Sequence, residues 1–156
     1  MTAAVIAPQQ PKEHERLRLW IRILRVQRLI EGQLRERLKA EFDTTLPRFD
    51  VMAALYRQPE GMLMSDLSRY LLVSNGNVTG IVDRLVTDGH VMRAQRESDR
   101  RASIVSLTPS GTAVFRKMAA QHERWIDSYL AGIGEDDARH LANMLKSFRS
   151  EWERGA

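Results

Sequence analysis

Cysteine is absent from the 156 residues of this sequence. Its absence excludes disulfide bonds and a thiol redox switch, removes the commonest zinc ligand, and fits a reducing compartment. Long hydrophobic runs are also missing, because no stretch approaches the ~18 apolar residues that a membrane-spanning helix needs. Residues 1–10 lack the charged start and the apolar centre of a signal peptide. We therefore expect a soluble, cytoplasmic protein without a membrane segment.

Positive and negative side chains are nearly balanced in number. The chain has 24 Lys and Arg residues against 20 Asp and Glu residues, which leaves a net charge of +4. The excess lies mostly in residues 1–46, which carry nine basic and six acidic side chains. The hydrophobic fraction of 43% is enough for one folded core. We expect one domain, or one domain with terminal extensions, and charge alone is a weak argument for a nucleic-acid partner.

Motifs for catalysis are scarce. The sequence has neither an HExxH zinc-protease motif nor a GxSxG nucleophile motif. Gly76 and Gly80 lie inside a predicted helix, so they do not form a phosphate loop. Asp136, Asp137 and His140 are close enough to hold a metal ion weakly, but a solvated first turn of a helix explains them better. We expect no enzymatic activity, no cofactor and no metal site.

Residues 65–89 read as a short helix, a tight turn and a second helix. Ser74 is a good N-cap for the second helix, and Val73 before it can pack on Val78. Asp88 and Gly89 supply the stop. One face of this helix is apolar at helical spacing and consists of Val78, Ile81, Val82 and Leu85. The pattern predicts a helix-turn-helix.

The opposite face of the second helix is small and polar. It carries Asn75, Gly76, Thr79, Gly80 and Asp83. A glycine in an exposed helix interior costs about 1 kcal/mol relative to alanine. Two such glycines on one face indicate close approach by another molecule, and a DNA groove fits this description. The alternative is an ordinary pair of packed helices.

A charged hairpin follows directly. Residues 90–96 and 102–108 alternate as strands, and residues 97–101 form a tip that we expect to be too long for a two-residue turn. Arg96, Arg100 and Arg101 place three positive charges at this tip. A two-stranded hairpin attached to a helix-turn-helix is a wing, whose tip can insert an arginine into the minor groove. The alternative is a tip that is merely solvated.

Long amphipathic helices are predicted at both ends of the chain. One covers residues 12–41, and another covers residues 135–153. A third begins with Thr108 as cap and Pro109, and its apolar positions are Val114, Met118, Gln121 or His122, Trp125 and Tyr129. Their combined apolar surface is larger than one subunit can cover, which predicts a homodimer; the alternative is a monomeric helical subdomain. The predicted regions are a leader (1–11), a dimerisation helix (12–46), a DNA-binding region (47–108) and dimerisation helices (109–156).

Residues 99–108 read as Asp, any residue and Arg, followed by an alternating strand that ends in Leu-Thr, and Gly111 lies just beyond. This pattern resembles the wing signature of the MarR family. The resemblance extends over residues 12–152 and implies a mainly helical winged helix-turn-helix with a small β-hairpin wing. It implies that Asp99 orients Arg101 toward the minor groove. One departure is Gly80, where the family often has a longer polar or basic residue, so DNA shape or close approach of the backbone gains weight over base readout. The DNA-binding candidates are Ser65, Ser74, Asn75, Asn77, Thr79, Arg84, Arg96, Asp99, Arg100 and Arg101.

Residues 46–55 and 73–85 are similar to MarR-type repressors of aromatic-acid and hydroxycinnamate breakdown. This likeness implies an effector, either a small aromatic compound or an aromatic acyl-CoA thioester, bound between the dimerisation helices and the winged region. The ligand-binding candidates are Trp20, Arg22, Ile23, Phe49, Met52 and Trp125. We expect a dimeric repressor that leaves a palindromic operator on double-stranded DNA when the effector binds. The alternative is a winged-helix architectural or protein-docking module without sequence-specific readout.

Overall fold

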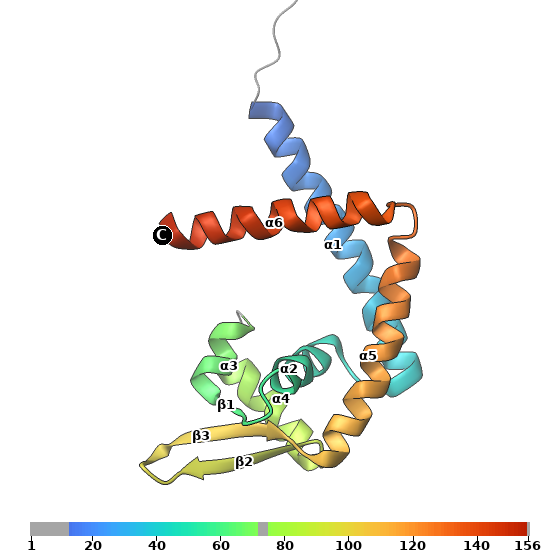
Figure 1. Ribbon diagram of the computed structural model, residues 1–156. Coiled ribbons are helices and arrows are strands. Elements are labelled where there is room, and N and C mark those ends of the chain that lie inside the picture. Colours follow the sequence, from blue (N-terminus) through green and yellow to red (C-terminus); the bar gives the residue numbers. More distant parts are fainter. Residues whose placement is uncertain (1–12, 72–74, 156) are drawn as a thin grey trace, which may run out of the picture.

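The computed structural model describes residues 13–71 and 75–155 and is mainly helical with one small sheet (Figure 1). This architecture confirms the predicted fold class. The elements in chain order are α1 (Glu13–Phe42), α2 (Leu46–Tyr56), β1 (Met62–Leu63), α3 (Met64–Tyr70), α4 (Asn75–Thr87), β2 (Val91–Arg96), β3 (Asp99–Leu107), α5 (Pro109–Tyr129) and α6 (Glu135–Gly155).

Side-chain caps begin two of the helices, and the one at Thr108 confirms the sequence prediction. The Thr45 hydroxyl accepts a hydrogen bond from the Arg48 amide at 3.4 Å at the start of α2. The Thr108 hydroxyl accepts one from the Gly111 amide at 2.9 Å at the start of α5. In both helices a proline occupies the first turn, where its missing amide proton costs nothing.

The sheet corrects two expectations about the hairpin. It has three antiparallel strands in the order β1-β3-β2, because Met62 and Leu63 pair with β3 and add a strand that the two-stranded prediction lacked. The tip is also shorter than predicted: Arg96 pairs with Asp99 across a two-residue turn. Charged residues can extend the ladder because strand pairing uses backbone groups and does not need apolar side chains.

The strand register explains why the tip is shorter than the predicted residues 97–101. Gln95 pairs with Ser103, while its neighbour Arg96 pairs with Asp99. Residues 100–102 therefore have no partner on β2 and form a bulge in β3. A bulge bends and twists a strand locally. The two arginines that were expected at the turn lie in this bulge.

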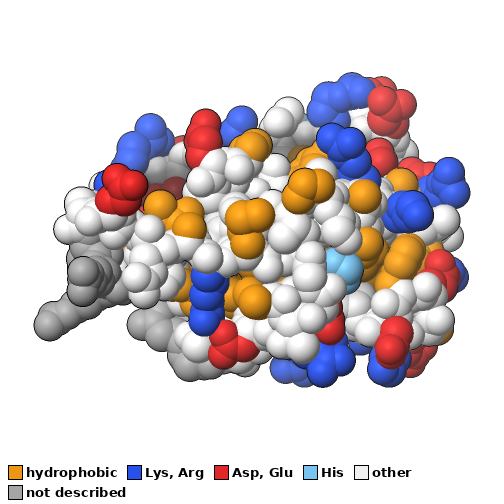
Figure 2. All heavy atoms as spheres, turned by 90° about the horizontal axis from the view of Figure 1, so that it is seen from below, with side chains coloured by type: hydrophobic (Ala, Val, Ile, Leu, Met, Phe, Trp, Pro, Cys, Tyr) orange, Lys and Arg blue, Asp and Glu red, His pale blue; other side chains and the backbone are white. Residues whose placement is uncertain are grey.

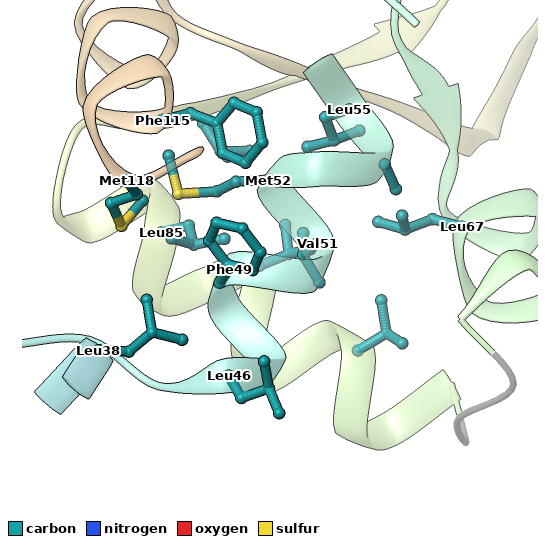
Figure 3. Packing of buried hydrophobic residues seen from close by; sticks show 14 of the residues in the cluster. Leu38, Leu46, Phe49, Val51, Met52, Leu55, Leu67, Leu85, Phe115 and Met118 are labelled. Atoms are coloured by element: carbon teal, nitrogen blue, oxygen red, sulfur yellow. The ribbon is translucent and has the colours of Figure 1, made fainter. Parts of the chain in front are cut away.

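The core joins the winged region to α1 and α5. The predicted stripe of α4 is confirmed, since Val78, Val82 and Leu85 are fully buried. Figure 3 shows Leu85 beside Met52 of α2 and Met118 of α5, and all three residues of the stripe belong to the same core cluster. Phe49 lies between Phe115 and His122, with ring centroids 5.5 and 4.7 Å away. Phe115 was missing from the predicted stripe of α5.

The two terminal helices leave large apolar surfaces exposed to solvent. No residue of α6 is buried, and 60% of Phe148 and 69% of Trp152 are exposed. The N-terminal half of α1 likewise projects beyond the core (Figure 1) and leaves 54% of Trp20 exposed. Among the described residues, no helix is long and apolar enough to cross a membrane.

Candidate nucleic-acid interface

The helix-turn-helix is formed by α3 and α4. Ser65 is exposed in the first turn of α3. The turn between the helices, including the predicted cap Ser74, lies outside the described residues. Asn75 begins α4, although the structure does not describe its side chain.

The outer face of α4 is exposed and sterically open. Asn77, Thr79 and Gly80 all lie on the surface. A Cβ atom added at Gly80 would meet nothing within 4 Å. No other part of the described chain therefore requires a glycine here, and the space beside it is free for a DNA backbone or groove.

An acidic side chain of α4 and the one directly after its end are paired with arginines. The Asp83 carboxylate lies 2.8 Å from the Arg93 guanidinium of β2, and the Asp88 carboxylate lies 3.3 Å from Arg84. The first pair joins the wing to α4 and offsets a negative charge that would repel DNA phosphates. Sequence reasoning did not single out Arg93, because pairing between a strand and a preceding helix has no local pattern.

The wing presents its predicted residues near the far end of the sheet. Arg96 is exposed at the end of β2. Asp99 begins β3, and Arg100 and Arg101 follow it in the bulge. The side chains of these three residues lie outside what the structure describes, so the implied contact between Asp99 and Arg101 stays a prediction.

Hydrogen bonds fix the base of the wing to α5. The Thr108 amide donates to the His90 carbonyl at 3.0 Å, and the Thr108 hydroxyl donates to the Gly89 carbonyl at 2.7 Å. Gly111 packs against the same segment, because a Cβ added there would lie 1.9 Å from the His90 carbonyl oxygen. The direction of the wing is therefore set by contacts that only glycine permits at position 111.

Charge on the underside of the molecule is mixed. Figure 2 shows Lys and Arg side chains there separated by acidic and uncharged ones. This distribution agrees with the small net charge of +4. DNA affinity would then depend on a few well-placed arginines rather than on a continuous basic surface.

The six predicted ligand residues are not brought together within one protomer. Phe49, Met52 and Trp125 are buried in the core, with at most 6% of each exposed. Trp20, Arg22 and Ile23 lie on the exposed half of α1. At 1.5 Å per residue, Trp20 is about 27 Å along α1 from Leu38, which packs in the core. Apolar character alone could not separate core residues from ligand contacts.

A small hollow between α1, α2 and α4 was missed by sequence reasoning. It measures about 180 Å³ and is lined by Glu31, Arg35, Leu46, Pro47, Asp50, Leu71, Asn77 and Ile81. Partial burial and the nearby Glu31 raise the pKa of the Asp50 carboxyl, and Arg35 offsets part of this effect. We call it the α1–α2–α4 hollow. A signal for it was present, since Asp50 interrupts an otherwise apolar stretch of α2.

A helix-turn-helix with an open outer face, followed directly by a wing, defines a winged helix-turn-helix DNA-binding regulator. Residues 42–102 match the profile of the MarR family. Over 131 residues the chain is 33% identical to the transcriptional activatory protein BadR of Rhodopseudomonas palustris, a match covering 82% of this chain and 74% of that protein. This protein therefore belongs to the MarR family of transcriptional regulators.

Solved structures agree with this assignment. A MarR family transcriptional regulator from Silicibacter pomeroyi has a TM-score of 0.75 and 32% identity, covering 92% of this chain and 99% of that chain. A MarR mutant from E. coli complexed with operator DNA has a TM-score of 0.74 and 25% identity, covering 89% and 98%. These relatives are regulators and not enzymes, which confirms the prediction from the missing catalytic motifs.

Proposed function

We propose that this protein is a cytoplasmic homodimer that binds a palindromic operator and leaves it when a small aromatic effector binds. The observation that carries the DNA-binding part is the open face of α4 at Asn77, Thr79 and Gly80, with the wing held beside it by the Asp83–Arg93 pair. That arrangement offers one helix to a major groove and one hairpin tip to the adjacent minor groove.

The exposed terminal helices support the dimer. We assign residues 12–46 and 109–156 to dimerisation and residues 47–108 to DNA binding. The apolar side chains left open on α6 include Leu141, Leu145, Phe148 and Trp152. A two-fold dimer would cover them and would place two α4 helices for half-sites about one DNA turn, roughly 34 Å, apart.

The α1–α2–α4 hollow supports a link between effector and DNA. Its lining contains Arg35 of the dimerisation helix and Asn77 of the recognition helix. A ligand held between them would favour one orientation of α4 relative to α1 over the other, which shifts the population of DNA-competent dimers. Arg35 suits the carboxylate of a free aromatic acid or a phosphate of an acyl-CoA thioester. We propose Trp20, Arg22 and Ile23 as ligand contacts only in the dimer, because in one protomer they lie on the exposed half of α1.

The direction of regulation has two candidates. Repression follows from the likeness to repressors of aromatic-acid breakdown. Activation is the second candidate, because the 33% identical relative is named a transcriptional activatory protein. A reporter placed behind the operator, measured with and without the gene for this protein, separates them by the sign of the change.

Binding to a palindrome from the upstream region of the gene for this protein tests the DNA-binding function. We expect much tighter binding to the palindrome than to a scrambled duplex of equal length and composition, at one fixed salt concentration. Equal affinity for both duplexes, with a steep dependence on salt, would instead support the architectural alternative. Aromatic acids and their CoA thioesters, added to the complex, then test the effector.

A further inference from the structure

The N-terminal half of α1 carries a row of arginines. Between Glu15 and Glu31 the chain has five arginines and no acidic residue. At 3.6 residues per turn, four of these arginines lie on one side of the helix, within about 120° around its axis. We call this group the α1 arginine row, and it consists of Arg18, Arg22, Arg25 and Arg28. Neighbouring members are about 4.5–6 Å apart along the helix axis.

The charge of this row is exposed and mostly without carboxylate partners. All four side chains lie on the surface. The Arg18 guanidinium lies 2.6 Å from the Glu15 carboxylate. Among the residues that the structure describes, the other three members of the row have no hydrogen-bond or ion-pair partner. Residues 1–12 contain no acidic side chain that could supply one. The α1 arginine row is therefore a local excess of positive charge.

The row is far from the surface that we assign to the operator. Figure 1 shows the N-terminal half of α1 and the hairpin of β2 and β3 at opposite ends of the molecule. Arg25 is about 20 Å along α1 from Leu38, which is buried in the core. A DNA duplex held by α4 and the wing therefore leaves the row uncovered.

The apolar side of the same segment points in another direction. Leu19, Ile23 and Val26 are exposed and lie about a third of a turn from the centre of the row. A second copy of the chain that covered these side chains would leave the arginines accessible. The proposed dimer and the free arginine row are thus compatible.

A row of guanidinium groups is complementary to a row of phosphates. Arginine donates paired hydrogen bonds to phosphate oxygens and stays charged at every physiological pH. One DNA strand has a phosphate every ~3.4 Å along the duplex axis, so the ~15 Å from Arg18 to Arg28 matches about four phosphates. No aromatic side chain lies within the row that would read or stack on a base. The expected contact is with the backbone and not with the sequence.

An anionic membrane surface fits the row less well. A helix that lies on a membrane needs a continuous apolar face opposite its charges. The positions opposite the α1 arginine row are Arg16 and Gln27, which are polar. Inserting that side into lipid would bury a charge and an amide without partners.

We propose that the α1 arginine row binds the phosphate backbone of a second segment of double-stranded DNA. The proposal rests on the DNA-binding part of the proposed function, which supplies the first segment, but not on the effector. Binding of this kind is weak, with dissociation constants of about 10⁻⁴–10⁻⁶ M at physiological salt. Neighbouring DNA on the same molecule is present at a high effective concentration, so weak contacts are enough to bridge two segments.

Capture of a second duplex by the operator-bound protein tests the row. Full-length protein is loaded on a surface-tethered operator, and a labelled duplex without operator sequence is then added at several salt concentrations. We expect the wild type to retain the labelled duplex at low salt. In the double variant Arg25→Gln/Arg28→Gln the slope of log affinity against log salt should become shallower by about 2, because each lost phosphate contact contributes ~0.9. Affinity for the tethered operator and the melting temperature should stay unchanged.

A matched variant separates the row from net charge. Arg139→Gln/Arg149→Gln removes the same charge from α6, where both arginines have carboxylate partners at 3.0 and 3.5 Å, and it should leave the slope unchanged. An equal loss in this control, or no capture by the wild type at low salt, would overturn the proposal. If the tethered operator binds no better than a scrambled duplex, the proposed function fails instead, and the salt slope for a free duplex in solution still tests the row.

Two further measurements identify a different partner of the row. If the row variant changes the dimer equilibrium in sedimentation but captures the second duplex like the wild type, the arginines pair with a second copy and the proposal is wrong. Binding to vesicles of phosphatidylglycerol and phosphatidylcholine under conditions where no duplex is captured would likewise refute it in favour of a lipid surface.

Discussion

Substitution of Gly80 by alanine separates the stability of α4 from its contact with DNA. Gly80 is in the interior of a 13-residue helix and is exposed. Glycine there costs about 1 kcal/mol of helix stability relative to alanine, because its backbone loses more conformational freedom on folding. The added methyl group has no steric cost in the free protein, since it meets nothing within 4 Å.

The expected gain is about 1 kcal/mol of unfolding free energy, which corresponds to a rise in melting temperature of about 2–4 °C for a protein of this size. Operator affinity should fall at the same time if the DNA lies against the helix at Gly80. The two quantities are measured by thermal unfolding followed by circular dichroism and by fluorescence anisotropy with a labelled operator, at one salt concentration.

Each result refutes a different step of the reasoning. A variant that is more stable and binds the operator as tightly as the wild type would show that DNA does not approach Gly80 closely. A variant that gains no stability would show that the helix is not free at this position. Gly32→Ala is the matched control, because it adds a methyl group at an exposed position of α1 that likewise meets nothing within 4 Å and lies outside the predicted DNA-binding region.

Four further predictions concern the wing, the dimer and the response to pH. Gly111→Ala places a methyl group 1.9 Å from the His90 carbonyl oxygen and should lower the free energy of unfolding by about 1–3 kcal/mol or more. The melting temperature should fall accordingly, and an unchanged melting temperature would contradict the tight contact. Arg101→Ala should weaken specific operator binding by roughly ten-fold or more while sedimentation still shows a dimer, since one groove contact contributes about 1–3 kcal/mol. Leu145→Glu places a charge on the exposed seam of α6 and should yield monomers in sedimentation, whereas an intact dimer would exclude this seam from the interface. Burial lowers the pKa of the His122 imidazole below its ordinary value of 6.5. The unfolded chain therefore takes up the proton first, and the free energy of unfolding falls as the pH drops below that value. In His122→Phe the melting temperature should depend less on pH in this range.

Features encoded by neighbouring residues could be predicted from the sequence. The Thr45 and Thr108 caps, the following prolines and the apolar stripe of α4 are local patterns with one physical solution each. The bounds of α1 and α6 and the start of α5 consequently agree with the predicted helices to within a few residues. The alternating residues on both sides of the charged tip predict the wing, and the pattern of residues 99–108 carries the resemblance to the family.

Features that join distant residues could not be predicted in the same way. The short strand at Met62 has no periodicity of its own and exists only because β3 offers a free edge at Val105. The predicted ligand residues lie apart within one chain, because an aromatic residue at helical spacing, such as Phe49 or Trp125, serves a core as well as a pocket. Arg116 and Tyr56 are 60 residues apart, and only the packing of α5 on α2 places them together.

The shared core limits how an effector could act on DNA binding. Leu38 of α1 and Met118 of α5 are fully buried with Val82 of α4 in one cluster. A close-packed core has discrete arrangements and does not deform continuously, so α4 cannot loosen without disturbing the parts of α1 and α5 that pack in this cluster. We infer that an effector in the α1–α2–α4 hollow changes the angle between α1 and the winged region as a whole. DNA release should then accompany a change in the distance between the two recognition helices, measurable between spin labels on Thr87 of each protomer, without loss of helical content.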